Sequence, residues 1–442
     1  MKRTNRILLG IGCVILLLIS WLTAVTAKTN AEKQRELIDQ ADAYLADEIY
    51  VLAQPLLEEA ASYEDEFTLE AEAKLKHVYL VLIGQSGYSS DYEDLLDKQM
   101  ARDDATPDIF MEAAQYYLND GEPNDAFSVL KKGIEKETIQ DDSQLVEMYE
   151  ANRYIYETSR SSYQDVTQIH NGAIQVCQNG YWGLASSNGS LQIPCEYDAI
   201  STYSDGQVIV RRGEVISAVN SDNNRVALYH GEADSFGNYS ETRMGLHTKD
   251  GWRIANGTFA VADTVFEEVG LCENGRIPAK LDGKWGMIDS SVTEWLLPAQ
   301  FDDIIRDELG RSMAQNVFFA KKQNNVYLYN LEGEELAGPF EDARPFTESN
   351  WAAVKKNGKW GFIDAAGNVM LNPQYDDAES FSQHLAAVKV GQKWGYVSLY
   401  GELVIGPIFD QAKSFSQGCA PVRTGEGWQI ITLVEYEEDA GL

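Results

Sequence analysis

A tryptophan followed by a glycine recurs along the second half of the chain, and this repetition limits the possible folds more than any other feature. The motif reads GKWGFID at residues 358–364, GKWGMID at 283–289 and QKWGYVS at 392–398. With weaker copies included, eight centres follow at spacings of 33, 37, 33, 41, 34, 34 and 34 residues. Such a period predicts repeated units that each bury an apolar face against a neighbour. The centres are Trp182, Val215, Trp252, Trp285, Val326, Trp360, Trp394 and Trp428.

Each unit carries the pattern of short strands joined by turns. Asn357-Gly358 stands between two apolar runs, which predicts a tight hairpin turn there. The tryptophan then opens the second strand, and the glycine after it lets a neighbouring ring or backbone approach closely. A proline 12 or 13 residues after five of the centres is expected to end the third strand. One unit is therefore predicted to be a three-stranded meander, with room for a short fourth segment.

This array resembles the WG-repeat family of bacterial proteins, also called KWG repeats. The resemblance covers about 60% of the chain, and it is weak at Val215 and Val326, where both motif residues are absent. Eight units fit a β-propeller, whereas an open β superhelix would need no closure. We expect a propeller-like domain and keep the open array as the alternative. The expected core residues of the repeats are Trp182, Gly183, Trp252, Trp285, Gly286, Trp360, Gly361, Trp394, Gly395 and Trp428.

Residues 30–168 instead show apolar side chains at helical spacing. Turn residues at 119–123 predict a break between helices at 109–118 and 124–136, and a further helix at 143–156 is expected to cap the stack. Two segments carry small residues, a tyrosine and a leucine at identical internal offsets, which would let paired helices approach closely. They are Ala41, Tyr44, Ala53, Leu57 and Ala60, and then Ala114, Tyr117, Ala126, Leu130 and Gly133. This pattern resembles the tetratricopeptide repeat, which implies a concave surface for peptides, or else a spacer.

The N-terminus carries three basic residues before an uncharged apolar run at residues 7–27. About 21 helical residues span ~31 Å, which matches a bilayer core of ~30 Å. We expect a single transmembrane helix, with the basic flank in the cytoplasm and most of the chain outside it. The alternative is a signal peptide cleaved after the small residues at 25–27, which would make the protein secreted.

The composition excludes some functions. A formal net charge of −33 argues against nucleic acid as a partner, because phosphates require clustered Lys and Arg. The five cysteines have no C-x-x-C spacing, and the five histidines are scattered, so we predict no metal, cofactor or catalytic site. Cys177 and Cys195 lie in one repeat, where they are either small buried side chains or a disulfide formed outside the cytoplasm.

Acidic pairs such as Asp302-Asp303 and Asp376-Asp377 follow the third strand of several units. Paired carboxylates can bind Ca²⁺ or act as acid and base. Because these pairs recur at one place in the unit, we interpret them as turn residues whose carboxylates accept backbone N–H groups. Trp295 and Tyr400 lie off the repeat pattern and are the candidates for contact with a sugar ring.

The sequence thus predicts a multidomain protein with four parts: a basic flank and transmembrane anchor at 1–29, a tetratricopeptide-like helical domain at 30–168, a WG-repeat β domain at 169–434 and an acidic tail at 435–442. The predicted function is a non-enzymatic, membrane-anchored scaffold that binds protein partners through its repeats. The alternative is a module that binds cell-wall polysaccharide.

Overall fold

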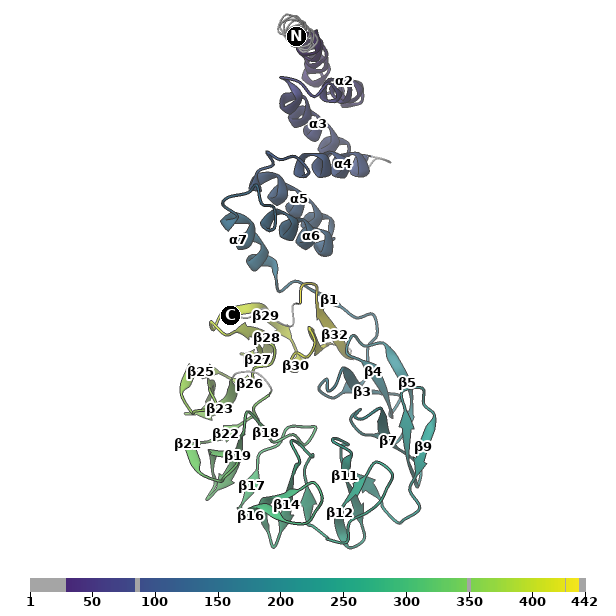
Figure 1. Cartoon of the computed structure of the whole chain (residues 1–442), viewed down its shortest axis with the longest axis vertical. Coiled ribbons are helices and arrows are strands. Elements are labelled where there is room, and N and C mark those ends of the chain that lie inside the picture. The colour runs from purple at the N-terminus through teal and green to yellow at the C-terminus, as the bar shows by residue number, and fades with distance from the viewer. Residues whose placement is uncertain (1–28, 84–87, 348–350, 426, 437–442) are drawn as a thin grey trace, which may run out of the picture. The chain divides into compact units, whose positions relative to one another are not determined.

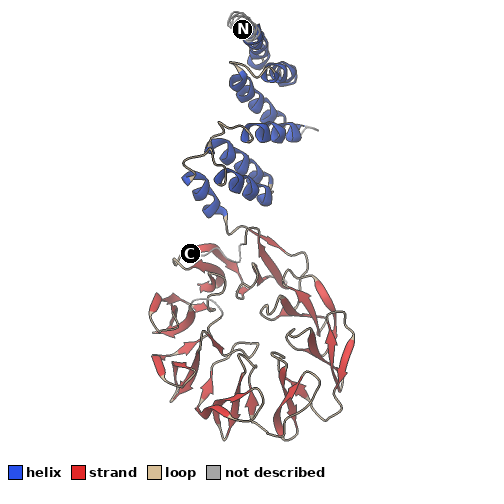
Figure 2. Cartoon of the chain, viewed as in Figure 1, coloured by secondary structure: helices blue, strands red, loops and turns tan. Residues whose placement is uncertain are grey.

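The computed structural model describes residues 29–83, 88–347, 351–425 and 427–436. The chain divides into two compact units, Met1–Ala151 and Asn152–Leu442. The described part of the first unit is helical, and that of the second is built from strands (Figures 1 and 2).

No helix among the described residues has both the length and the apolar character needed to cross a membrane. The described helices carry charged side chains, as in α3 (Thr68–Leu82), where the partly buried Lys74 and Lys76 form ion pairs with Asp42 and Glu112 of other helices. The apolar run at 7–27 lies outside the described residues. The fold class predicted from the sequence, which included a transmembrane helix, is therefore corrected to a helical array followed by a β-propeller.

The helical unit buries one continuous core between paired helices. Most of the small and aliphatic residues singled out in the sequence are buried there, whereas Tyr117 is partly buried and Tyr44 is 37% exposed. A Cβ on Gly133 would lie 2.8 Å from the ring of Phe110, so this glycine allows close helix contact. The helices span residues 29–46, α2 (Tyr50–Ser62), α3, α4 (Tyr88–Met100), α5 (Pro107–Asp120), α6 (Pro123–Ile134) and α7 (Ser143–Asn152).

The last helix is shorter than predicted. We expect it to reach residue 156 from the sequence, but α7 ends at Asn152 and residues 156–158 form a strand of the second unit. The boundary between the units therefore lies between Ala151 and Asn152, ahead of the predicted position at 168/169.

The described residues of the second unit form eight antiparallel sheets arranged around a ring, which we number as blades 1 to 8 in chain order (Figure 1). Most blades begin with a strand of two residues near the centre and end with a longer strand at the rim. The strands are β2 (Asp165–Val166), β3 (Ala173–Gln178), β4 (Tyr181–Ser186) and β5 (Leu191–Tyr197) in blade 1; β6 (Ala199–Ile200), β7 (Gln207–Arg212), β8 (Val215–Asn220) and β9 (Arg225–Leu228) in blade 2; β10 (Ser235–Phe236), β11 (Arg243–Thr248) and β12 (Gly251–Asn256) in blade 3; β13 (Glu268–Val269), β14 (Arg276–Leu281), β15 (Lys284–Asp289) and β16 (Trp295–Phe301) in blade 4; β17 (Asp303–Ile304), β18 (Met313–Ala314), β19 (Val317–Lys322), β20 (Asn325–Asn330) and β21 (Glu335–Phe340) in blade 5; β22 (Asp342–Ala343), β23 (Ala352–Lys356), β24 (Lys359–Ile363) and β25 (Val369–Tyr375) in blade 6; β26 (Asp377–Ala378), β27 (Leu385–Val390), β28 (Lys393–Ser398) and β29 (Leu403–Phe409) in blade 7; and β30 (Gln411–Ala412), β31 (Cys419–Thr424), β32 (Gly427–Leu433) and β1 (Tyr156–Thr158) in blade 8.

The ring is closed by a strand that precedes the first repeat. Strand β1 pairs antiparallel with β32, the last strand of the chain. The backbone N–H of Ser159 continues this pairing by donating to Ile430 O at 2.7 Å, and Tyr163 and Trp428 exchange two backbone hydrogen bonds. Residues from both ends of the unit thus share one blade. The expected propeller is confirmed, and the open superhelix is excluded.

The glycine of the Trp-Gly motif is required by the strand that follows it. A Cβ on Gly361 would lie 2.6 Å from both Leu371 O and Pro373 N, which belong to β25. The pairing shifts from Trp360–Tyr375 to Phe362–Leu371, so a span of four residues in β25 faces two in β24. This bulge crosses directly over the glycine. Gly183, Gly286 and Gly395 have equally short contacts with the backbone of their own outer strands.

The prolines of the repeats occupy the same bulges. Pro194, Pro298, Pro373 and Pro407 lie inside β5, β16, β25 and β29, so the expectation that they end the third strand is wrong. A bulge leaves one residue outside the ladder, and proline is tolerated there because it has no N–H to donate.

The motif tryptophans differ in burial. Trp285, Trp360, Trp394 and Trp428 are between 2% and 9% exposed, whereas Trp182 and Trp252 are only partly buried. Cations lie over three of the buried rings: Arg306 over Trp285 at 3.7 Å, Arg344 over Trp360 at 4.7 Å and Lys413 over Trp428 at 5.1 Å. These indoles fill the blades and also support cationic side chains.

The recurring acidic residues connect successive blades. Asp376 accepts hydrogen bonds from Lys359 Nζ at 2.5 Å and from Gly391 N at 2.7 Å, so one carboxylate joins blade 6 to the hairpin turn of blade 7. Asp410 contacts Lys393 and Gly425 in the same way, and Asp302 contacts Lys284 and Gln323. These contacts match the turn role inferred from the sequence.

Candidate functional site

A polar cavity of about 210 Å³ lies among the inner loops of blades 1, 5, 6, 7 and 8. It is lined by the residues that follow the short first strands, among them His170, Ser382 and Ser416. Loops of five blades meet there because short first strands such as β26 and β30 lie on the inner side of the ring (Figure 1). The site is thus assembled by ring closure.

One position in these inner loops shows which residues depart from the repeat. It is the residue before the two-residue turn that leads into the second strand, and it is serine in blades 2, 3, 7 and 8: Ser204, Ser240, Ser382 and Ser416. Blade 1 has His170 at this position, blade 4 has Glu273 and blade 5 has Ala314. His170 and Glu273 are the two titratable side chains among these described positions, so they are candidates for a specific role.

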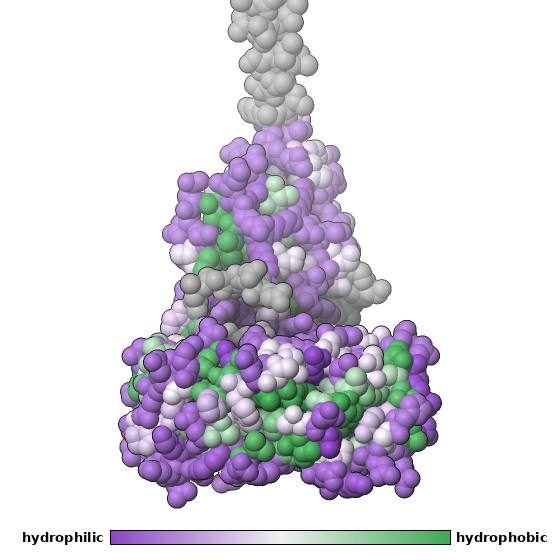
Figure 3. Space-filling view, turned by 60° about the horizontal axis from the view of Figure 1, so that its bottom comes forward, coloured by the Kyte–Doolittle hydropathy of each residue, from purple (hydrophilic) through white to green (hydrophobic). Residues whose placement is uncertain are grey.

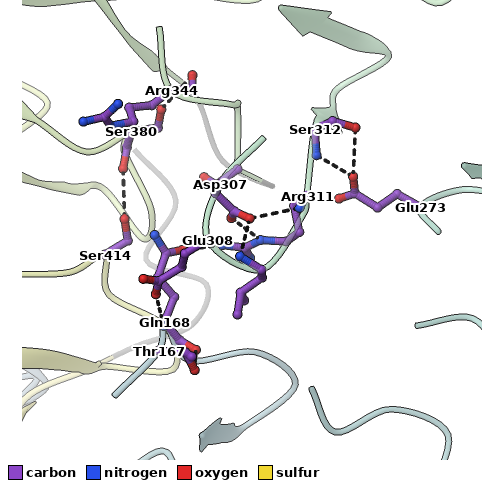
Figure 4. Close-up of polar contacts among 12 residues, drawn as sticks. Thr167, Gln168, Glu273, Asp307, Glu308, Arg311, Ser312, Arg344, Ser380 and Ser414 are labelled. Atoms are coloured by element: carbon purple, nitrogen blue, oxygen red, sulfur yellow. Dashed lines mark hydrogen bonds and ion pairs between the residues drawn. The ribbon is translucent and has the colours of Figure 1, made fainter. Parts of the chain in front are cut away.

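A loop of blade 5, residues 305–312, extends among the inner loops of other blades, and we call it the central loop. It belongs to the unit with the longest spacing, the 41 residues between the centres Trp285 and Val326. Glu308 accepts hydrogen bonds from Gln168 N in blade 1 and from Lys413 Nζ in blade 8 (Figure 4 shows Glu308 beside Gln168). Leu309 O accepts one from Asn238 Nδ2 at 3.0 Å, in blade 3. The loop therefore links blades that are far apart in sequence.

Arg311 is the part of the central loop that lines the cavity. Its Nε donates to Asp307 Oδ2 at 2.6 Å, and its Nη2 donates to Gln168 Oε1 (Figure 4). Asp307 also accepts the backbone N–H groups of Leu309 and Arg311, both at 2.9 Å. Asp307 thus shapes the loop and orients the guanidinium of Arg311. The Arg311 side chain remains 23% exposed.

Two glutamates near the central loop have perturbed acidity. Burial raises the pKa of Glu273 to about 7, although its carboxylate accepts Ser312 N at 2.7 Å and Met313 N at 3.2 Å. Burial likewise raises the pKa of Glu379 to about 7, with Arg344 and Lys413 acting in the opposite direction. A carboxyl group in a poorly hydrated site favours its neutral form, which explains both directions.

Burial also shifts the pKa of a basic group, His170. Burial lowers the pKa of its imidazole to about 4, and the nearby charge of Arg311 acts in the same direction. Its Nε2 is buried and has no hydrogen-bond partner among the described residues. A neutral imidazole with an unsatisfied nitrogen thus lies at the cavity wall.

These shifts predict the pH dependence of stability. Because Glu379 holds its proton more tightly in the folded state than in the unfolded state, it contributes stability at acidic pH that is lost as pH rises from about 4.5 to about 7. His170 acts in the opposite sense, because its contribution is lost as pH falls from about 6.5 to about 4. We therefore expect the difference in Tm between Glu379→Gln and the wild type to change with pH. The Tm of the variant relative to the wild type should rise by a few degrees as pH increases from 5 to 8. Thermal unfolding followed by circular dichroism checks this, and a pH-independent difference would contradict it.

The other residues considered in the sequence analysis lie elsewhere. Trp295 packs against Phe266 with a ring separation of 6.1 Å, and Tyr400 is 72% exposed in the turn between β28 and β29. The cysteines in the described residues are free, including Cys177 and Cys195. No group of three His, Cys, Asp or Glu side chains suited to a metal ion occurs in the described part of the chain.

The central site is not evident from the sequence, in which His170 is one of five scattered histidines and Glu273 belongs to no motif. Two signals could have pointed there: the departure from serine at one position of the inner loop, and the 41-residue spacing that contains the central loop. The contacts themselves link residues as far apart as Gln168 and Arg311, which no local pattern shows.

Four segments of the second unit match a known family of repeats. The family described as "WG containing repeat" matches residues 182–214, 329–360, 360–394 and 394–428. No curated protein matches the chain. The tetratricopeptide resemblance of the helical unit stays a prediction.

Several solved structures are similar in fold. PorZ, a surface component of the type-IX secretion system of Porphyromonas gingivalis, has a TM-score of 0.33 and 11% identity, with coverage of 54% of this chain and 37% of that one. The chain thus matches little more than a third of PorZ. A eukaryotic initiation factor has a TM-score of 0.40 and 11% identity over 57% and 78% of the two chains. The WD40 domain of SCAP from fission yeast has a TM-score of 0.37 and 9% identity over 64% and 99%. Similarity this low carries no argument about function. The matched segments nevertheless show that the C-terminal region of this chain contains WG repeats.

Proposed function

We propose that this protein is a non-enzymatic scaffold that binds protein partners through its repeat-built surfaces. The observation that carries the proposal is a groove of about 580 Å³ at the rim, between β21 of blade 5 and strands β24 and β25 of blade 6. Its wall is mainly apolar, with Phe340, Val369 and Leu371, and Lys356 and Lys359 stand at its border. Exposed apolar surface bordered by polar groups is typical of protein-binding sites.

The groove lies where blade 5 departs from the repeat. Tyr327 occupies the place of the motif glycine, and a Cβ on Gly338 would lie 2.6 Å from the Tyr327 ring. In other blades the motif glycine makes room for the outer strand. In blade 5 the roles are exchanged, because Gly338 in the outer strand β21 makes room for the Tyr327 ring. That strand has six residues, whereas β25 has seven. On the other side of the groove, Val369 at the start of β25 is 60% exposed.

The rim as a whole favours contact with extended protein segments. The outer strands β5, β16, β21, β25 and β29 have no further strand on their outer edge within the described residues. Such edges offer unpaired backbone groups to an added strand. Exposed apolar residues accompany them, such as Leu191, Leu336 and Ile408. Figure 3 shows hydrophobic residues gathered on the propeller among hydrophilic ones.

The test compares two matched substitutions on the full chain. Val369→Asp introduces a charge in the groove, whereas Val226→Asp introduces the same charge on β9, at a residue that is 53% exposed and does not line the groove. We expect the wild type and V226D to capture the same proteins on cross-linking. V369D should capture these proteins at least about tenfold less, because loss of one central apolar contact often costs that much affinity. Quantitative mass spectrometry of the captured proteins measures this.

Equal capture by both variants would contradict the groove as the binding surface. Capture of no protein, together with co-sedimentation of the chain with purified wall polysaccharide, would favour the alternative function. The predicted location outside the cytoplasm is tested separately, by the mass of the mature protein in cell and culture fractions.

A further inference from the structure

The chemistry of the central cavity is unusual for a chain of this charge. Arg311 is the one charged side chain among the described residues that line it, and the rest of the lining is mainly polar and uncharged. The chain as a whole has 69 acidic and 36 basic residues. Three nearby acids bond to other groups and do not line the cavity: Asp307 to Arg311, Glu273 to backbone N–H groups of the central loop, and Glu308 to Gln168 N and Lys413. Among the described residues, the cavity lining therefore presents a cation and neutral groups, without a carboxylate.

The lining also offers hydrogen-bond donors. A guanidinium has five N–H donors, and the bonds to Asp307 and Gln168 use two of those on Arg311. The buried Nε2 of His170 has no hydrogen-bond partner in the part of the chain that the structure describes, and it is a donor in one tautomer of the neutral ring. Ser416 adds a hydroxyl and Asn171 an amide from the inner turns of blades 8 and 1. Convergent donors around one cation are typical of sites for oxyanions.

We propose that the central cavity binds a small oxyanion, a carboxylate or a phosphate group, through Arg311 with His170 and the surrounding hydroxyl and amide groups. The volume of about 210 Å³ limits the ligand to a small molecule, below the ~300–1,000 Å³ of sites for larger ligands. Because Asp307 orients the guanidinium in advance, binding requires no large rearrangement. This proposal is independent of the rim groove and of protein binding there.

The site also explains the two titratable residues that replace serine at this position, His170 and Glu273. Serine at the positions of His170 and Glu273 would leave the central loop without its backbone acceptor in blade 4 and the cavity without its imidazole in blade 1. Glu273 is thus a positioning residue that holds Ser312, the neighbour of Arg311. His170 and Arg311 are the residues that would contact the ligand.

The experiment is isothermal titration of the full chain with inorganic phosphate and, separately, with acetate and with citrate. Ionic strength is held constant, and chloride is the control. We expect saturable binding of at least one oxyanion, and the preferred probe distinguishes a phosphate ligand from a carboxylate ligand. Arg311→Gln should weaken binding about 10- to 100-fold, because it removes a charged hydrogen-bond donor. Arg306→Gln changes an arginine of the same loop that does not line the cavity, and it should leave the affinity within about twofold.

A second pair of variants keeps the test decisive if Arg311→Gln does not fold. Ser416→Glu adds a negative charge to the cavity, and Ser416→Gln adds a neutral side chain of similar size. We expect S416E to lose at least about tenfold in affinity relative to S416Q, because the like charge repels the oxyanion. Failure of every oxyanion to saturate the wild type, or equal binding by S416E and S416Q, would overturn the proposal.

Discussion

Gly361→Ala is expected to destabilise the propeller by roughly 3 kcal/mol or more, which is beyond the usual cost of one added methyl group in a core. The added Cβ would lie 2.6 Å from Leu371 O and from Pro373 N, and both contacts are with backbone. A flexible side chain could rotate away, but a strand held in its ladder cannot. The bulge of β25 must therefore open or the strand must leave the sheet. Chemical denaturation of the full chain measures the loss in free energy of unfolding.

Gly406→Ala is the matched control for this change. It lies in an outer strand of the next blade, and a Cβ there meets no atom within 4 Å. We expect the control to stay within about 0.5 kcal/mol of the wild type, as surface substitutions usually do. Similar stability of G361A and G406A would show that the outer strand does not need the glycine beneath it, and the explanation of the motif would then fail.

Ser159→Pro is expected to open the ring, with a loss of about 2–3 kcal/mol. Proline removes the N–H that donates to Ile430 O at 2.7 Å, and it removes the hydroxyl that accepts Ile430 N at 3.0 Å. Both bonds hold the closing strand against β32. Hydrogen exchange measured by mass spectrometry should show faster exchange in β31 and β32, while blade 4 on the other side of the ring keeps its protection.

Ser159→Ala separates the two contributions, because it removes the hydroxyl and keeps the backbone donor. It is expected to cost about 1 kcal/mol and to leave exchange in blade 8 close to that of the wild type. Uniformly faster exchange in all blades of S159P would mean that the ring unfolds as one unit, and the closing strand would then have no special role.

Much of the propeller could be predicted because each blade repeats a local signal. The Asn357-Gly358 turn, Trp360 and Gly361 lie close together in sequence, and the contacts they specify are between strands joined by short hairpins. Spacing even located blades 2 and 5, where Val215 and Val326 replace the tryptophan. The prediction that proline ends a strand failed because a bulge, which can hold a proline, has the same local signature as a strand end.

The ring closure and the central cavity could not be predicted in this way. The segment Tyr156–Thr158 is too short to carry a strand pattern, and its partner is β32, more than 270 residues later. The central loop likewise depends on contacts such as Asn238 with Leu309, which exist only when several blades are in place. The predicted transmembrane helix is a different case, because it depends on a stretch outside the described residues.

The pairing of β1 with β32 also has a consequence for how the protein folds. The hydrogen bond between Ser159 and Ile430 joins residues 271 positions apart, so the first residues of the second unit must wait for almost the whole chain before they find their partner. Contacts of such long sequence separation slow folding and lengthen the time for which strand edges stay exposed. During synthesis, blades 1 to 7 can form as their hairpins emerge, whereas blade 8 completes last. A chaperone that shields unpaired strands would therefore act on this protein in the interval before β32 leaves the ribosome.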